Sequence, residues 1–253
     1  MFKASWLMEK RSGNMRLIWL MPLCFSAFSL LWRGAAGRID DVHSVYATVS
    51  INLNTLLFLP ITCALLVNST VKRQKQLQLF LTSNGVDQKR LFWRQLVVNS
   101  GELAIILSLE AVIGTLILFI SGDVQFLAPS YYWFSLAVVY CCTLPVLTIS
   151  LVISQLSNRI ITLLVNFGLG IASALIALTK FWWALPWTYS MRSVASLLAI
   201  HPNGTILQPS DPVYHLLQPV QNVWRALFLS SAIFIIFLLV QVKIGGSKNA
   251  ALS

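Results

Sequence analysis

Two glutamates, Glu102 and Glu110, interrupt the apolar stretch formed by residues 96–120. Their separation of eight residues places them about 80° apart around a helix, so both side chains can face one interior stripe. A carboxylate at membrane depth is costly and usually functional. The chemistry open to this pair is contact with a substrate, binding of a proton, or a hydrogen bond between helices. Glu110 lies deeper and is the stronger candidate, whereas Glu102 is close enough to the membrane surface to be hydrated.

A second group of candidate residues is aromatic and follows the fifth apolar block: Trp182, Trp183, Trp187 and Tyr189. Such a dense group is typical of the aromatic belt at a membrane interface. It would either anchor the chain there or form a wall that contacts an amphiphilic substrate at the outer leaflet. Pro186 is expected to break a helix that enters from the fifth block, and residues 194–200 to form a small half-buried helix.

A third group lies in the polar loop after the second apolar block, where apolar side chains recur at the i, i+3, i+4 spacing of one helix face: Leu77, Phe80 and Leu81. This spacing predicts a short amphipathic helix. Ser83-Asn84-Gly85 predicts a break after it, and Asp87 and Arg90 begin the next helix. A short helix held between two spans is suited to docking into a partner's groove. Alternatively, the charges of this loop serve only to set the membrane topology.

Several familiar chemistries have no motif in this sequence. There is no GxxxxGK[ST] phosphate loop, no GxSxG and no HExxH. The four cysteines lie in apolar blocks and form no CxxC pair, and the three histidines show no ligand spacing. The sequence therefore predicts a chain that is not an enzyme and holds no cofactor or metal.

The composition indicates a membrane protein. Hydrophobic residues make up 57% of the chain and charged residues 10%, compared with about 25% charged residues in soluble domains. Six apolar blocks are expected to cross the membrane as helices within one domain, 1–253, because blocks of this length without strict alternation exclude a barrel. The predicted spans are 17–32, 49–71, 96–120, 132–155, 160–179 and 223–242.

The arginines and lysines predict the orientation. With six spans, thirteen of the eighteen basic residues fall on the side of both termini, and six of these lie in the loop after the second span: Lys72, Arg73, Lys75, Lys89, Arg90 and Arg94. The positive-inside rule then places both termini in the cytoplasm. Residues 2–11 mix aromatic and basic side chains and are expected either to form a short interfacial helix or to remain a charged tail. Small residues such as Gly170 with Ala174 predict close packing of the fifth span.

The order of these features resembles that of type-2 ABC exporter permeases. A more specific resemblance is local. Trp183-Ala184-Leu185-Pro186-Trp187-Thr188-Tyr189, followed by Ile200-His201-Pro202-Asn203-Gly204, is similar to a pattern of lantibiotic-immunity ABC transporter permeases.

This resemblance implies an all-α, type-2 ABC exporter permease-like fold, with residues 75–90 as a cytoplasmic coupling helix and residues 2–11 as an N-terminal interfacial helix. It also implies ATP-binding cassette subunits that hold ATP and Mg, and a second permease that forms a heterodimer or homodimer with this chain. The complex would reside in the bacterial plasma membrane and expel a lantibiotic from it, which gives self-immunity and antibiotic resistance. Two alternatives remain: ABC export of another amphiphile, such as a lipid or another antibiotic, and a stand-alone ion- or proton-coupled carrier that uses Glu110.

Overall fold

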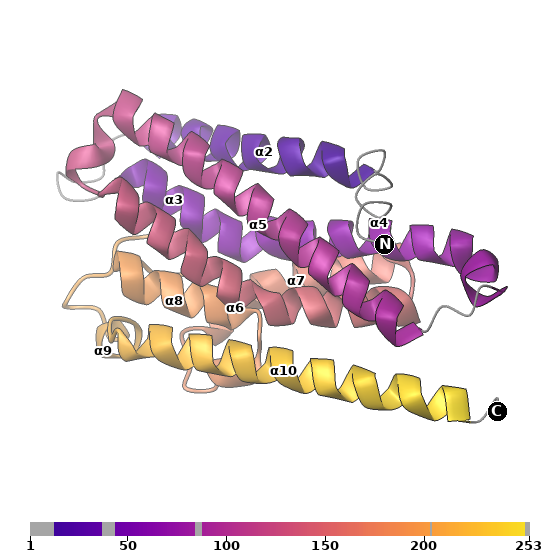
Figure 1. The fold of residues 1–253 in the computed structure, drawn as a ribbon. Helices are drawn as coiled ribbons and strands as arrows, with labels where there is room; N and C mark the ends of the chain where they lie inside the picture. The colour runs from indigo at the N-terminus through magenta and orange to yellow at the C-terminus, as the bar shows by residue number, and fades with distance from the viewer. Residues whose placement is uncertain (1–12, 37–43, 84–87, 203, 251–253) are drawn as a thin grey trace.

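The computed structural model describes residues 13–36, 44–83, 88–202 and 204–250, and within them the fold is all-α (Figure 1). An isolated antiparallel bridge between Ile200 and Ile206 is the nearest approach to a strand in these ranges. The helices are α2 (Gly13–Ala36), α3 (Val45–Leu53), the π-helical turn η1 (Asn54–Phe58), α4 (Leu59–Ser83), α5 (Gln88–Ser121), η2 (Asp123–Gln125), α6 (Pro129–Leu156), α7 (Arg159–Ile176), η3 (Trp182–Ala184), α8 (Thr188–Leu198), α9 (Tyr214–Leu217) and α10 (Gln221–Ala250).

Within the described residues, six helical stretches are long and apolar enough to cross a membrane, which confirms the prediction of an all-α, multi-pass membrane protein. They are Asn14–Gly34, Tyr46–Gln76, Leu91–Ser121, Pro129–Leu156, Arg159–Ile176 and Gln221–Leu239. The second stretch joins α3, η1 and α4 into one span. Each stretch contains most of the corresponding predicted block, and the largest differences lie at the ends, where helices continue into polar sequence.

The spans form an antiparallel bundle in which α4 and α6 are central. In the most apolar window of the second and fourth spans 67% and 61% of the residues are buried, compared with 28%, 22% and 22% in the first, fifth and sixth spans. Accordingly α2 and α10 lie on opposite sides of the bundle in Figure 1. The described chain begins and ends at the same end of the bundle, and this end also carries the tips of α4 and α5 (Figure 1).

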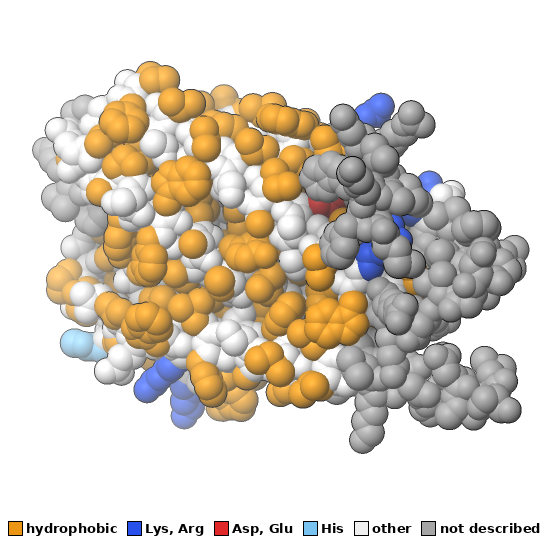
Figure 2. Space-filling model, in the orientation of Figure 1, with side chains coloured by type: hydrophobic (Ala, Val, Ile, Leu, Met, Phe, Trp, Pro, Cys, Tyr) orange, Lys and Arg blue, Asp and Glu red, His pale blue; other side chains and the backbone are white. Residues whose placement is uncertain are grey.

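The surface of the bundle carries many apolar side chains, as a surface in contact with lipid must. Figure 2 shows hydrophobic side chains over much of one face. Large exposed hydrophobic side chains come from all the peripheral helices, among them Leu31, Phe119, Leu164, Leu175 and Phe228. A water-soluble monomer rarely exposes an apolar surface of this extent.

The prediction of a short helix separate from the second span is wrong. The helix α4 continues from that span through Leu77, Phe80 and Leu81 to Ser83 without a break. The sequence from 61 to 83 contains neither glycine nor proline, so nothing interrupts the helical hydrogen bonds. The described part of α4 ends at Ser83 and residues 84–87 lie outside the described chain, so the break at Ser83-Asn84-Gly85 stays a prediction. Asp87, residues 2–11, and the side chains of Leu77, Phe80, Leu81 and Arg90 lie outside the part of the chain that the structure describes.

The region between the fifth and sixth spans also differs from expectation. The helix α7 already ends at Ile176, well before Pro186, and the small helix expected at 194–200 is instead α8, Thr188–Leu198. Every residue from 186 to 196 is buried, so this helix is an interior element rather than a half-buried one. The polar side chains of α8 resemble those of a surface loop, and only the tertiary structure shows that they face the neighbouring helices.

Candidate functional site

The carboxyl group of Glu110 lies at the centre of a polar cluster inside the bundle. The side chain of Glu110 is fully buried on the inward face of α5. The hydroxyl of Ser26, from α2, donates to Oε2 at 3.0 Å, and that of Ser50, from α3, donates to Oε1 at 2.8 Å. The phenol of Tyr132, from α6, donates more weakly to Oε1 at 3.4 Å. The carboxyl group therefore links four helices.

Two further polar side chains complete this cluster. The amide of Asn54, in the π-helical turn η1, lies beside the carboxyl group, and the phenol of Tyr46 lies beside Ser26, Ser50 and Tyr132. Both side chains are buried, yet neither the amide atoms of Asn54 nor the phenol oxygen of Tyr46 completes a hydrogen bond. Such buried groups are uncommon, because an unmade hydrogen bond costs about 1–3 kcal/mol. The Glu110 cluster (Ser26, Tyr46, Ser50, Asn54, Glu110 and Tyr132) thus retains unused donors and acceptors.

A glycine allows the phenol of Tyr132 to reach Glu110. Gly114 lies one turn beyond Glu110 on the same face of α5. A Cβ atom at Gly114 would come within 2.5 Å of the Tyr132 ring. Only a residue without a side chain lets the ring lie against the helix at this point. Gly114 therefore belongs to the cluster through the packing of its neighbour.

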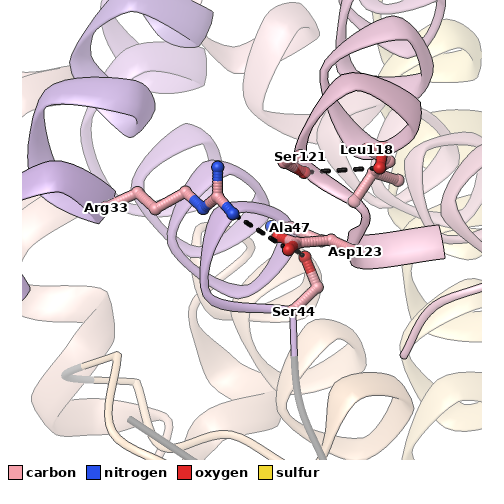
Figure 3. Close-up of polar contacts among 6 residues, drawn as sticks. All are labelled: Arg33, Ser44, Ala47, Leu118, Ser121 and Asp123. Atoms are coloured by element: carbon pink, nitrogen blue, oxygen red, sulfur yellow. Dashed lines mark hydrogen bonds and ion pairs between the residues drawn. The ribbon is translucent and has the colours of Figure 1, made fainter. Parts of the chain in front are cut away.

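Glu102 and Asp123 form two more contacts between α2 and the region of α5. Near the end of the bundle that carries the tip of α5, the amide of Asn14 donates to Glu102 Oε2 at 2.6 Å. At the opposite end, Arg33 forms an ion pair with Asp123 at 3.0 Å, and Ser44 donates to the other oxygen of the same carboxylate at 3.0 Å (Figure 3). Together with the bond from Ser26 to Glu110, these contacts hold α2 at three levels along its length.

The prediction that Glu102 and Glu110 share an interior stripe is confirmed, because the two side chains are 6% and 0% exposed and both contact α2. The sequence did not single out Ser26, Ser50, Asn54 or Tyr132. The only sequence feature that marks these residues as candidates is that each places a polar group within an apolar block. A hydroxyl in such a block usually bonds to its own helix, so this signal does not identify a shared site.

The aromatic residues of the Pro186 region divide between the interior and the surface. Trp182, Trp187 and Tyr189 are buried, whereas Trp183 is 55% exposed. The indole of Trp187 donates to Asn166 Oδ1 of α7 at 3.3 Å, and the phenol of Tyr189 donates to the backbone oxygen of Trp183 at 2.6 Å. Burial, with a smaller contribution from Cys142, raises the pKa of Tyr189 to about 12, so its phenol remains a donor at neutral pH. Of the four, only Trp183 presents its ring to the surroundings, and its contact with lipid or substrate stays a prediction.

Arg192 is a buried cation in the region between the fifth and sixth spans. It lies in α8 and is 1% exposed. Its guanidinium donates to the backbone oxygen of Ala177 at 2.5 Å and to that of Leu216, and it lies 5.5 Å from the centre of the Trp182 ring. No carboxylate among the described residues pairs with it. Desolvation lowers the pKa of Arg192 to about 10, so it remains charged at neutral pH.

Hydrogen bonds also join the helices at the base of the α4–α5 hairpin. Thr70 of α4 donates to Asn99 of α5 at 2.9 Å, and Gln95 of α5 bonds to Gln74 of α4. Gln155 of α6 donates to Gln95 at 3.0 Å. These contacts connect α4, α5 and α6 where they leave the apolar part of the bundle.

Metal-binding chemistry has no obvious centre in the described part of the chain, where no group of three or more His, Cys, Asp or Glu residues is placed to hold a metal ion. Comparison with protein-family models, with curated proteins and with solved structures gives no match to this chain.

Proposed function

We propose that this chain is the membrane permease subunit of an ATP-driven exporter, with ATP and Mg bound by a separate ATP-binding cassette subunit. The substrate class is a lantibiotic or a similar amphiphilic antimicrobial peptide, whose removal from the bacterial plasma membrane protects the cell. The proposal includes a second permease, as a heterodimer or homodimer, and cytoplasmic termini. It is supported by the six spans, by the local sequence resemblance and by the helical hairpin of α4 and α5.

The hairpin is the observation that carries this proposal. The helix α5 contains 34 residues, which corresponds to a length of about 51 Å at 1.5 Å per residue. The hydrocarbon core of a membrane is roughly 30 Å thick, so α5 extends beyond it. The helix α4 likewise continues past Gln76 to Ser83. A hairpin that leaves the membrane on the side with most of the basic residues offers a soluble subunit a place to bind.

The same hairpin provides a mechanical path from a partner into the bundle. Closure of ATP-binding subunits would push on the tips of α4 and α5. The bonds of Thr70 to Asn99 and of Gln155 to Gln95 would make these helices move together with α6. Because α5 carries Glu102 and Glu110, its motion would also reach α2. The peptide itself would contact the outer half of the bundle, where Trp183 is exposed.

The first test is purification of the tagged chain from its native membrane in mild detergent, with identification of the proteins that accompany it. We expect an ATP-binding subunit and a six-span chain in fixed ratio. We also expect ATP-dependent release of peptide when the complex is placed in vesicles. A chain that purifies alone and transports without ATP would contradict the proposal.

The second test addresses the hairpin. Substitution of Leu77, Phe80 and Leu81 by Asp should separate ATP hydrolysis from peptide export. A matched control is Leu156→Asp, which changes a side chain that is 84% exposed at the end of α6, outside the hairpin. We expect ATP hydrolysis without peptide export in the first variant, and both activities to be retained in the second. Normal assembly and immunity in the hairpin variant would exclude docking at this face.

The buried carboxyl group of Glu110 favours a second candidate function, that of a stand-alone proton-coupled carrier. Such a carrier would transport without an ATPase and would lose transport in the Glu110→Gln variant. An ATP-driven permease instead stops when the ATPase partner is inactivated. Transport measurements with and without ATP therefore separate the two functions.

A further inference from the structure

In the described part of the chain, the carboxyl group of Glu110 has no basic partner. The titratable groups that face it are phenols, Tyr46 from α3 and Tyr132 from α6, whereas α2 contributes Ser26 and η1 contributes Asn54. No described Lys, Arg or His residue forms an ion pair with it. A buried carboxylate without a counter-charge is expensive, and it can lower this cost by binding a proton.

The neighbours of Glu110 can satisfy the carboxyl group in both of its forms. In the ionised form the hydroxyls of Ser26, Ser50 and Tyr132 donate to its two oxygens. In the protonated form the carboxyl O–H itself needs an acceptor. The side-chain amide of Asn54 is buried beside the carboxyl group, and its oxygen accepts no hydrogen bond, so a rotation of this amide would offer the acceptor. Hydroxyl and amide groups both donate and accept, so the exchange needs only local rotations.

The distances favour a proton over a metal cation. Ser50 and Ser26 lie at direct hydrogen-bond distances of 2.8 and 3.0 Å from the carboxyl oxygens. A metal cation bound to these oxygens would have to replace the hydroxyl-to-carboxylate bonds and separate the groups. A proton adds no volume, and the observed packing can remain.

We propose that Glu110 is a proton-exchange site at which one proton binds to and leaves the carboxyl group inside the bundle. The bond from Ser26 to Glu110 is the middle contact of α2, and a hydrogen bond to a charged carboxylate is stronger than one to a neutral carboxyl group. Uptake of the proton therefore weakens the attachment of α2 to α5. This inference does not depend on an ATPase partner.

Infrared difference spectroscopy of the full chain in lipid vesicles tests the proposal directly. We compare spectra at high and low pH and look for the carbonyl band of a protonated carboxyl group. The wild-type chain should show a band that grows as the pH falls and shifts in deuterated water. The band should be lost in Glu110→Gln and retained in Glu102→Gln, a matched change eight positions earlier on the same face.

A second variant keeps the test decisive if Glu110→Gln does not fold. Ser50→Ala removes the shortest hydrogen bond to the carboxyl group and changes the side-chain volume little. Because the carbonyl loses a hydrogen bond, its band should move to higher frequency. An unchanged band in Ser50→Ala would overturn the proposal. So would a pH-dependent band that survives in folded Glu110→Gln, or a Glu110 band that responds to sodium at constant pH.

Discussion

Among the buried charged side chains, Glu110 and Arg192 have opposite signs, and neither forms an ion pair with another described residue. Glu110 lies between α2, α3, α5 and α6 and is surrounded by hydroxyl and amide groups. Arg192 lies in α8 and is bound by the backbone oxygens of Ala177 and Leu216. A carboxylate can lose its charge by binding a proton, whereas an arginine with a pKa of about 10 keeps its charge at neutral pH. Glu110 is therefore suited to a change of charge state, whereas Arg192 is suited to holding α8 permanently against the backbone oxygens of Ala177 and Leu216.

The largest expected effect is that of Arg192→Met. This change removes two hydrogen bonds from a charged donor, each of which contributes about 1.5–3 kcal/mol. The backbone oxygen of Ala177 loses its side-chain donor, whereas that of Leu216 still accepts from Asn222 at 2.8 Å. We expect the free energy of unfolding to fall by about 3 kcal/mol or more, measured by denaturant titration in lipid bicelles.

The matched control is Arg225→Met on α10, where the side chain is exposed and the same charge is removed. Its effect should remain small. Arg192→Lys should restore only part of the stability, because a lysine ammonium does not match the planar fork of arginine. Equal losses for Arg192→Met and Arg225→Met would mean that Arg192 is not a permanent attachment.

The next effect is that of Gly114→Ala, which acts on the Glu110 cluster. The new Cβ atom would lie 2.5 Å from the Tyr132 ring and would displace the phenol from Glu110. Overpacking of this kind costs roughly 1–3 kcal/mol of stability. Gly101→Ala is the control, since it lies on the same helix with no atom within 4 Å, and it should be neutral or slightly stabilising. The same loss at both glycines would argue against a specific contact with Tyr132.

A smaller effect is expected at the Arg33–Asp123 ion pair. Arg33 is partly exposed, so Arg33→Gln should cost about 1 kcal/mol or less. Asp123→Asn should cost more, because Asp123 also accepts a hydrogen bond from Ser44 at the start of α3. Thermal unfolding at low and high salt checks this prediction. The cost of Arg33→Gln should shrink as salt increases, and a salt-independent cost would show that packing rather than charge is lost.

The smallest effect concerns the exposed turn after α8. The backbone N–H of Gln208 and, secondarily, His201 lower the pKa of Asp211 below its ordinary value. A lowered folded-state pKa gives stability that is present above the unfolded value of about 3.9 and is lost as the pH falls through the folded value. In the wild-type chain, proteases should therefore cleave this turn more slowly at neutral than at acidic pH. Asp211→Asn should reduce this difference in cleavage rate, measured by limited proteolysis. The same dependence of cleavage rate on pH in the wild-type chain and in Asp211→Asn would contradict a lowered pKa of Asp211.

The sequence by itself determined the number of spans and the inward direction of Glu102 and Glu110. Long apolar blocks must become helices in lipid, and a spacing of eight residues fixes two side chains on neighbouring parts of one helix face.

Only the tertiary structure decided what these side chains meet. Ser26, Ser50 and Tyr132 come from three helices, and no local pattern records that they converge on Glu110. The sequence predicted only a half-buried helix at residues 194–200. That α8 lies in the interior depends on partners from distant segments, such as Leu217 for Ser196 and Ala177 for Arg192. Helix formation follows from local composition and the membrane environment, whereas the satisfaction of buried polar groups depends on contacts between distant segments.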